Sequence, residues 1–324
     1  MGLLIAAEMS VLNAEIKPIS NCEVKHILPI LKKKTFDLGK QKEEADMDRK
    51  AVARETVKIM EQGYYELEGK QIDIGLDMET SIKHSFLLTP QQGEVLLEKY
   101  STSENVTSKN CTTYVENIST VDAIRKLAGE GKDDIGVLNF ASAKNPGGGF
   151  LNGAMAQEES LAASSTLYKT LTAHEEYYRN NRLQNSMIYT NYAIYSPDVV
   201  FFRDGRFRLV PSAVRASVLT LPAVNMGQIL LKGEDETKAK QAMRQRMKLA
   251  LAIFAEQGAK HLVLGAYGCG VFRNDPKLVA AWWKELLAEG MSQYFDTIFY
   301  AVFDRSKNGE CINAFEQKLS VSIL

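Results

Sequence analysis

The sequence predicts a layered α/β protein with a largely buried central sheet. Strand-like hydrophobic runs alternate with helical patterns from Cys111 onward, and two of these runs lead into glycine-rich segments. The length of 324 residues suits one large domain or two smaller ones, with a well-buried core.

The composition narrows the class of protein. Hydrophobic residues make up 45% and charged residues 24%, as in ordinary soluble globular proteins. The net charge of −1 lacks the basic excess that is usual in binders of duplex nucleic acid. No apolar stretch approaches the roughly 20 residues that a membrane span needs. We therefore expect a soluble monomer that binds neither duplex nucleic acid nor a membrane.

The cysteines and histidines indicate neither a disulfide framework nor a zinc site. The four cysteines have no C-x-x-C spacing, and the four histidines are isolated from one another. A reducing compartment is the better match for scattered free thiols, so we expect a cytoplasmic location. The cysteines are Cys22, Cys111, Cys269 and Cys311.

The first hundred residues divide into an extension and the start of the main domain. Residues 1–45 show no clean period and end in a charged run, which predicts an N-terminal helical extension. A helical face begins near Met47 and stops at Gly63, a typical residue just after a helix. Two short strands, 64–67 and 71–74, then flank a turn, and a polar loop with a short helix covers 89–109.

The remaining elements follow from hydrophobic runs and amphipathic patterns in turn. Strands are expected at 111–115, 135–140, 186–190, 198–202, 207–210, 216–219, 261–264 and 297–303. Helices are expected at 120–128, 157–171, 236–257, 276–288 and 309–319. Gly258 follows the longest helix and Pro276 opens the next, as helix-end preferences predict.

Three consecutive glycines, Gly147, Gly148 and Gly149, follow the strand at 135–140. Such a run costs backbone entropy, permits positive φ and presents bare N–H groups to an anion. A flexible hinge or lid is the plainer interpretation. A P-loop is excluded because Phe150 follows the glycines, and the dinucleotide fingerprint fails because Asn152 stands where it needs glycine.

Adjacent carboxylates, Glu158 and Glu159, follow Gln157 at the expected start of a helix. Acidic residues are common there because they favour the helix dipole. Neighbouring helical side chains diverge by about 100°, so we do not expect both carboxylates to point the same way. One of them is suited to acid/base chemistry on a bound sugar while the other holds that sugar in place.

A second glycine-rich loop, Gly265 to Phe272, follows the strand at 261–264. Bare backbone between a strand and a helix suits a pyrophosphate. Phe272 is suited to packing on a ribose or base, or to anchoring the loop in the core. Cys269 has no histidine near it in sequence, so a buried thiol is expected in place of a nucleophile. Because ligands bind at the carboxyl ends of strands in such sheets, both loops are expected to face one crevice.

The triple glycine, the spacer and Gln-Glu-Glu together resemble the signature of poly(ADP-ribose) glycohydrolases of the macrodomain class, in their compact microbial form. Further segments are similar to that family in the same order over about residues 50–305. They are Glu55-Thr56 to Gly63-Tyr64, Val137 to Ala143, Tyr195 to Arg203, Leu221 to Asn225, and Leu264 to Pro276.

The resemblance implies a macrodomain over residues 46–324, a mixed sheet between helices with a cleft for ADP-ribose. Its motif implies that Glu159 is the catalytic acid/base and that Glu158 holds the ribose hydroxyls. The other implied substrate-binding residues are Asn139, Gly147, Gly148, Gly149, Gln157, Gly268, Cys269, Gly270, Val271 and Phe272.

The implied reaction is hydrolysis at the ribose C1″ of poly(ADP-ribose) or ADP-ribosylated protein, with neither metal nor cofactor. One alternative keeps the fold but places a protein side chain, such as arginine, on the ribose. A second is an ADP-ribose reader without catalysis, against which the paired glutamates argue. A nucleotide-binding dehydrogenase is the third, and the failed fingerprint disfavours it.

Overall fold

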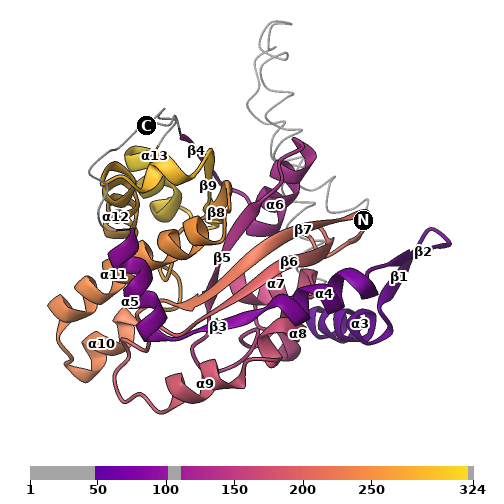
Figure 1. The fold of residues 1–324 in the computed structure, drawn as a ribbon, viewed down its shortest axis with the longest axis horizontal. Coiled ribbons are helices and arrows are strands. Elements are labelled where there is room, and N and C mark those ends of the chain that lie inside the picture. The colour runs from indigo at the N-terminus through magenta and orange to yellow at the C-terminus, as the bar shows by residue number, and fades with distance from the viewer. Residues whose placement is uncertain (1–47, 101–110, 320–324) are drawn as a thin grey trace, which may run out of the picture. The chain divides into compact units, whose positions relative to one another are not determined.

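The computed structural model describes residues 48–100 and 111–319, and its centre is a seven-stranded mixed sheet flanked by helices (Figure 1). This architecture confirms the predicted α/β class and the mixed sheet between helices. The predicted N-terminal extension, residues 1–45, lies outside the described residues, as does Cys22.

The strand order in the sheet is β3-β6-β7-β5-β8-β9-β4, and a separate hairpin pairs β1 with β2. The five strands from β7 to β4 are mutually parallel, whereas at one side β6 runs antiparallel to β7 and β3 runs antiparallel to β6. The strands are β1 Tyr64–Leu67, β2 Lys70–Asp73, β3 Phe86–Leu88, β4 Thr112–Glu116, β5 Ile135–Ala141, β6 Ala193–Arg203, β7 Leu209–Pro222, β8 His261–Leu264 and β9 Thr297–Ala301.

Helices cover both faces of the sheet (Figure 1). The α-helices are α3 Arg49–Gln62, α4 Gly75–His84, α5 Pro90–Lys99, α6 Thr120–Gly129, α7 Gln157–Ser164, α8 Leu167–Thr172, α9 Glu175–Arg182, α10 Met226–Lys232, α11 Glu236–Glu256, α12 Pro276–Ala288 and α13 Glu310–Leu319. Two 3-10 turns, η1 Phe150–Asn152 and η2 Met291–Tyr294, complete the described elements.

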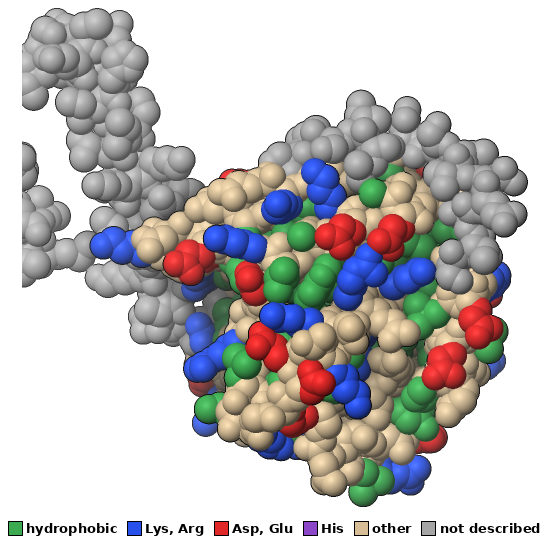
Figure 2. Space-filling view, turned by 90° about the vertical axis from the view of Figure 1, so that its left-hand side faces the viewer, with side chains coloured by type: hydrophobic (Ala, Val, Ile, Leu, Met, Phe, Trp, Pro, Cys, Tyr) green, Lys and Arg blue, Asp and Glu red, His purple; other side chains and the backbone are tan. Residues whose placement is uncertain are grey.

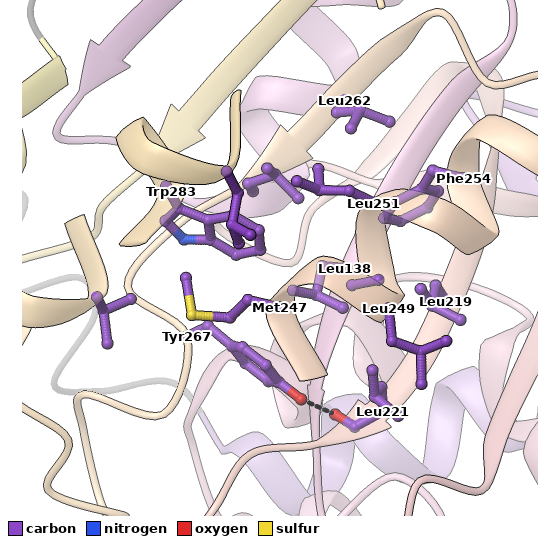
Figure 3. Close-up of a cluster of buried hydrophobic side chains, with 14 of the residues drawn as sticks. Leu138, Leu219, Leu221, Met247, Leu249, Leu251, Phe254, Leu262, Tyr267 and Trp283 are labelled. Carbon is purple, nitrogen blue, oxygen red and sulfur yellow. Dashed lines mark hydrogen bonds between the residues drawn. The ribbon is translucent and has the colours of Figure 1, made fainter. Parts of the chain in front are cut away.

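Alternating strand residues build two hydrophobic cores, one on each face of the sheet. Leu138 packs with α11 and α12, while its neighbour Val137 packs with α6 and α7. The same alternation holds for Val218 and Leu219 in β7, because successive strand side chains point to opposite faces. Figure 3 shows the first of these cores, where Leu138 and Leu219 lie beneath α11.

Side-chain caps explain several helix starts. Thr89 and Gln92 form a reciprocal capping box at α5, and the Ser119 hydroxyl accepts from the Asp122 N–H at α6. Asp275 accepts from the Lys277 N–H at the start of α12. These caps satisfy N–H groups that have no partner inside the helix, so they fix where each helix begins.

The prediction of a single helix at 157–171 is wrong, because this segment forms two helices, α7 and α8. Ser165 between them is extended and forms an isolated β-bridge with Phe201. Its hydroxyl donates to the Leu161 carbonyl, which satisfies the end of α7. Pairing with a distant strand therefore overrides the local helical preference.

The segment 186–190, where we expected a strand, is a loop. The buried guanidinium of Arg246 in α11 donates hydrogen bonds to the carbonyls of Ile188 and Tyr189, so these carbonyls do not pair with a neighbouring strand. Of the three short strands expected between 198 and 219, 198–202 lies within β6 and 216–219 lies within β7, whereas 207–210 overlaps β7 only from Leu209 onward. The elements α4, β3, α9 and α10 were not predicted, since each is short and lacks a strong period.

Figure 2 shows the side of the molecule that carries α5, α10, α11 and α12, where Lys and Arg are interspersed with Asp and Glu. Ion pairs join many of them, including Arg244 with Glu289 and Lys99 with Glu256. This face therefore has no stripe of one charge. Within the described ranges, no helix combines the length and apolar character that crossing a bilayer requires.

Candidate active site

Both glycine loops lie at the same edge of the sheet, as the sequence predicts. The first loop, residues 142–156, follows β5, and the second, residues 265–275, follows β8. These two strands are parallel neighbours in the middle of the sheet, so their carboxyl ends meet. This edge is where open parallel sheets bind their ligands.

Gln157 fills the gap that opens between these strands. Pairing of β5 with β8 covers only Ile135 to Val137. Beyond it, the Gln157 amide donates to the Leu138 carbonyl at 2.9 Å and accepts from the Phe140 N–H at 2.9 Å. The side chain thus substitutes for a strand and anchors the start of α7. Direct contact of Gln157 with substrate stays a prediction.

Glu158 is 3% exposed and lies under the first loop. One carboxylate oxygen accepts from the Ser142 N–H at 2.6 Å, and the other accepts from the Asn139 amide at 3.4 Å. Burial is the main cause that raises the pKa of Glu158 to about 8, with a further contribution from the charge of Glu159. Its hydrogen-bond donors lower the pKa but do not outweigh burial. Burial therefore favours the protonated form of this carboxyl.

Glu159 is held by two backbone N–H groups of the first loop. Its Oε1 accepts from Gly149 and its Oε2 from Ala156, each at 3.0 Å. Among the described residues neither oxygen has a side-chain hydrogen-bond partner, so the loop itself orients this carboxylate.

The two carboxylates meet at Gly148, although neighbouring helical positions diverge. A Cβ atom on Gly148 would lie 2.3 Å from Oε1 of Glu159 and 3.2 Å from Oε2 of Glu158. The φ of Gly148 is also +60°, which disfavours any residue with a side chain. Glycine here is what allows both acids to lie directly beneath the loop.

The first loop therefore uses its N–H groups internally. Gly149 donates to Glu159 and Gly148 donates to the Asn145 carbonyl, each at 3.0 Å, and the backbone N–H of Gly147 helps to lower the pKa of Glu158. We expected bare N–H groups facing an anion. In the structure the N–H groups of Gly149 and Ser142 hold Glu159 and Glu158 instead, and the N–H of Gly148 closes a turn within the loop.

Asn139 stands behind the acids, at the end of β5. It is completely buried, and its amide donates to Thr220 at 3.1 Å and to Glu158. Its carbonyl oxygen has no partner among the described residues. The predicted part of Asn139 in substrate binding would therefore act through Glu158.

The second loop is arranged differently, because its tip keeps free donors. Within residues 48–100 and 111–319, the N–H groups of Gly270, Val271 and Phe272 donate to no acceptor. Val271 is 82% exposed, so this tip faces solvent. A Cβ atom on Gly270 would meet nothing within 4 Å, which leaves space for a ligand.

Gly268 marks where the second loop turns. Its φ is +73°, and a Cβ atom there would lie 2.6 Å from the Asn274 amide nitrogen and 2.7 Å from Ala223. Asn274 holds the turn by donating to the carbonyls of Gly268 and Val224. Only a glycine fits so close to these neighbours.

The base of the second loop is fixed to the core. The Tyr267 hydroxyl donates to the Leu221 carbonyl at 2.9 Å, shown as a dashed line in Figure 3. The Trp283 indole donates to the Gly265 carbonyl at 3.2 Å. The loop therefore combines a rigid base with an open tip.

Cys269 and Phe272 lie on the same loop. A hydrogen bond with the Cys311 thiol, and then burial, raise the pKa of Cys269 well above its usual value. That direction matches the expectation of a thiol that is not a nucleophile. The Phe272 ring contacts Tyr189 with centroids 6.1 Å apart, which leaves both of its expected uses open.

Sequence analysis missed the residues that brace the first loop. The Ser142 hydroxyl accepts from the N–H groups of Lys144 and Asn145, and Arg182 donates to the Lys144 carbonyl at 3.0 Å. A serine before a turn is a signal that local rules can find. Arg182 gives no such signal, because it lies on the unpredicted α9.

The geometry supports proton transfer beside a bound anion. Two acids lie side by side, one of them with a raised pKa, and free N–H donors lie on the loop that follows the neighbouring strand. Within the described residues, no group of three or more His, Cys, Asp or Glu side chains is placed to hold a metal ion.

Comparison with known proteins gives concordant matches. The family model "Microbial-type PARG, catalytic domain" matches residues 53–204. The solved structure of poly(ADP-ribose) glycohydrolase from Thermomonospora curvata is 36% identical, with a TM-score of 0.79 over 84% of this chain and 99% of that one. The same enzyme bound to the inhibitor ADP-HPD matches over the same shares with a TM-score of 0.77.

A further match is the poly(ADP-ribose) glycohydrolase from Deinococcus radiodurans in complex with ADP-ribose. It is 39% identical, with a TM-score of 0.71 over 79% of this chain and 99% of that chain. A search of curated proteins found no match.

Proposed function

The chain belongs to the microbial-type poly(ADP-ribose) glycohydrolases, and we propose that Glu159 is the acid/base group that cleaves the bond at the ribose C1″ of poly(ADP-ribose). The observation that carries this proposal is the position of the Glu159 carboxylate. Two backbone N–H groups orient its carboxylate directly beneath Gly148, at the sheet edge that both loops share.

The reaction needs one proton donor that later accepts a proton. Glu159 in its acid form protonates the glycosidic oxygen as the bond from C1″ to that oxygen breaks, and C1″ gains oxocarbenium character. Water then adds to C1″ and passes a proton to Glu159, which restores the acid form. The products are ADP-ribose and the shortened chain, so atoms and charge balance.

Glu158 holds the ribose hydroxyls in this proposal. Its buried position, fixed by the Ser142 N–H and the Asn139 amide, gives it one orientation. A carboxyl that carries a proton both donates and accepts, which suits a pair of sugar hydroxyls. Gln157 contributes by anchoring both acids to the end of β5.

The diphosphate lies against the second loop in this proposal. The exposed N–H groups of Gly270, Val271 and Phe272 are suited to phosphate oxygens, and Gly268 with Cys269 shapes the turn that presents them. The relatives crystallised with ADP-ribose and with ADP-HPD support binding of a ligand of this chemical class.

A ribose bonded to protein is the alternative substrate. Both loops contact the ADP-ribose portion, so the same acid would also serve an ADP-ribosyl-arginine bond. A panel of poly(ADP-ribose) and protein modified on Arg, Ser or Glu separates the two. If ADP-ribose is released from arginine-modified protein alone, the substrate is ADP-ribosyl-arginine and not the polymer, and the proposed mechanism still applies.

Glu159→Gln tests the catalytic assignment. The amide keeps the shape but holds no transferable proton, so polymer hydrolysis should fall at least about a thousandfold. Calorimetry should find ADP-ribose affinity within about threefold of the unaltered protein, because the diphosphate contacts remain. Undiminished turnover in the variant contradicts the role of Glu159.

A further inference from the structure

Helix α3 lies against the part of the protein that carries Glu159. It packs on α7 and on the 3-10 turn η1 of the first loop. A small cavity, with room for about one water molecule, is lined by Arg49 and Val52 of α3 and by Glu159 and Ala163 of α7. Glu159 and Ala163 are four positions apart in α7, so they lie on the same face of that helix. Helix α3 therefore covers the face of α7 that bears Glu159.

Thr56 joins α3 to α7 through one buried hydrogen bond. Its side chain is completely buried, and its hydroxyl donates to the Ala163 carbonyl at 2.7 Å. Ala163 is the last residue but one of α7, and the final carbonyls of a helix have no partner inside it. The hydroxyl satisfies one of these carbonyls and thereby fixes how closely the two helices approach.

Arg203 at the end of β6 holds Thr56 in turn. Its guanidinium donates to the Thr56 hydroxyl at 3.3 Å and to the Glu55 carboxylate at 2.6 Å. It also donates to the Phe207 carbonyl at 2.8 Å. A buried charge is costly unless it is paired and hydrogen-bonded, so the guanidinium is restricted to the arrangement that satisfies it. Arg203 therefore links α3 to β6 and to Phe207.

Phe207 has an unfavourable backbone conformation. Its φ is +63°, a left-handed value that bulky residues rarely adopt. Its N–H donates to the Asp204 carbonyl at 2.9 Å, and its carbonyl accepts from Arg203, so a closed turn enforces this value. Phe207 lines the same cavity as Glu159. Strain of this kind persists only where neighbouring contacts impose it, and it is concentrated at active sites.

We propose that Thr56 and Arg203 are positioning residues for Glu159, which act by fixing α3 and Phe207 against the face of α7 that bears this acid. The inference rests on the proposed function. Both side chains are buried, so neither contacts the substrate. The first loop restrains the carboxylate oxygens, whereas Thr56 and Arg203 restrain the helix from which the Glu159 side chain extends. Both restraints matter because a misplacement of about 1 Å costs about a hundredfold in rate.

Thr56→Val tests the proposal, because it removes the hydroxyl and nearly keeps the shape of the side chain. The kcat for poly(ADP-ribose) should fall about tenfold while KM stays within about twofold, since α7 loses a restraint and the second loop is unaltered. Thr56→Ser retains the hydroxyl and should recover kcat to within about threefold of the unaltered protein. Arg203→Lys cannot make all three contacts, so it should lower kcat in the same way as Thr56→Val.

Thr170→Val is the matched control. Thr170 in α8 is also completely buried, and its hydroxyl donates to the Leu167 carbonyl at 2.8 Å and accepts from Ser196 at 2.7 Å. Both valine variants lose buried hydrogen bonds, so both should have a lower Tm, but Thr170→Val should keep the kcat of the unaltered protein. Calorimetry with ADP-ribose counts the folded binding sites in each variant, so that kcat is expressed per folded molecule.

Three outcomes would overturn the positioning role. They are an unchanged kcat in Thr56→Val, an equal loss of kcat in Thr170→Val, and a failure of Thr56→Ser to recover kcat. Full turnover of polymer by Glu159→Gln would reject the proposed function, and this inference with it.

Discussion

The two glycine loops follow neighbouring parallel strands yet use their backbones in opposite ways. The first turns its N–H groups inward, onto Glu158 and Glu159. The second fixes its base to the core and leaves the donors at its tip free. One loop therefore positions acids, and the other is open to an anion.

This difference teaches that glycine serves two purposes in one cleft. At Gly148 the absent side chain makes room for carboxylates of the protein itself. At Gly270 it leaves room for something that the protein does not supply. Substitutions in the first loop should accordingly affect kcat, and those in the second should affect binding.

Gly148→Ala should have the largest effect. The new methyl group would stand 2.3 Å from a carboxylate oxygen of Glu159, so the acid must move. A displacement of this kind costs about a hundredfold in rate, and steady-state kinetics on polymer should show the loss mainly in kcat. If the variant instead raised KM by about a hundredfold and left kcat unchanged, the distinction between the two loops would be contradicted.

Gly268→Ala should have a smaller effect, of a different kind. The methyl group would meet Asn274 and Ala223 and strain a residue with φ of +73°, which distorts the diphosphate loop. ADP-ribose affinity measured by calorimetry should weaken about tenfold, with a lower Tm and kcat at saturation retained. Gly270→Ala is the matched control, because its methyl group meets nothing within 4 Å and Tm should stay unchanged.

Glu158→Gln tests the first loop through the pH dependence of protein stability. The folded pKa of about 8 exceeds the ordinary 4.5 because the carboxyl is buried. Between these values the folded protein keeps a proton that the unfolded chain has lost, so its stability falls as pH rises through this window and levels off above it.

The glutamine variant lacks this titration. Its Tm should exceed that of the unaltered protein by a margin that grows up to about pH 8 and is then constant, on the order of 5 °C. Thermal denaturation from pH 5 to 9 measures both proteins in parallel. Tm curves that stay parallel would mean that Glu158 is already ionised in the folded state.

Local patterns were sufficient for the elements with strong signals. The helix at α11, the hairpin of β1 and β2, and the strand β8 lie at or near their expected positions. The candidate site residues were chosen in the same way, because glycine runs and paired acids are visible in the chain, and their roles stay predictions. The prediction that 46–324 forms one macrodomain, with 1–45 outside it, stays a prediction.

Other features depended on distant contacts and were missed. Ser165 breaks a helix because it pairs with Phe201, and Arg246 converts an expected strand into a loop. The convergence of Glu158 and Glu159 at Gly148 is of the same kind, since backbone donors ten or more residues away draw the carboxylates together.

The sequence by itself determined the α/β class, the two loops and the acids between them, because hydrophobic periods and glycine runs are local properties. Only the tertiary structure decided how those parts work. It gave Glu158 its raised pKa through burial, directed the N–H groups of one loop inward, and placed Arg49 at a cavity beside Glu159. Burial, hydrogen-bond direction and proximity between distant segments exist only once the chain is packed.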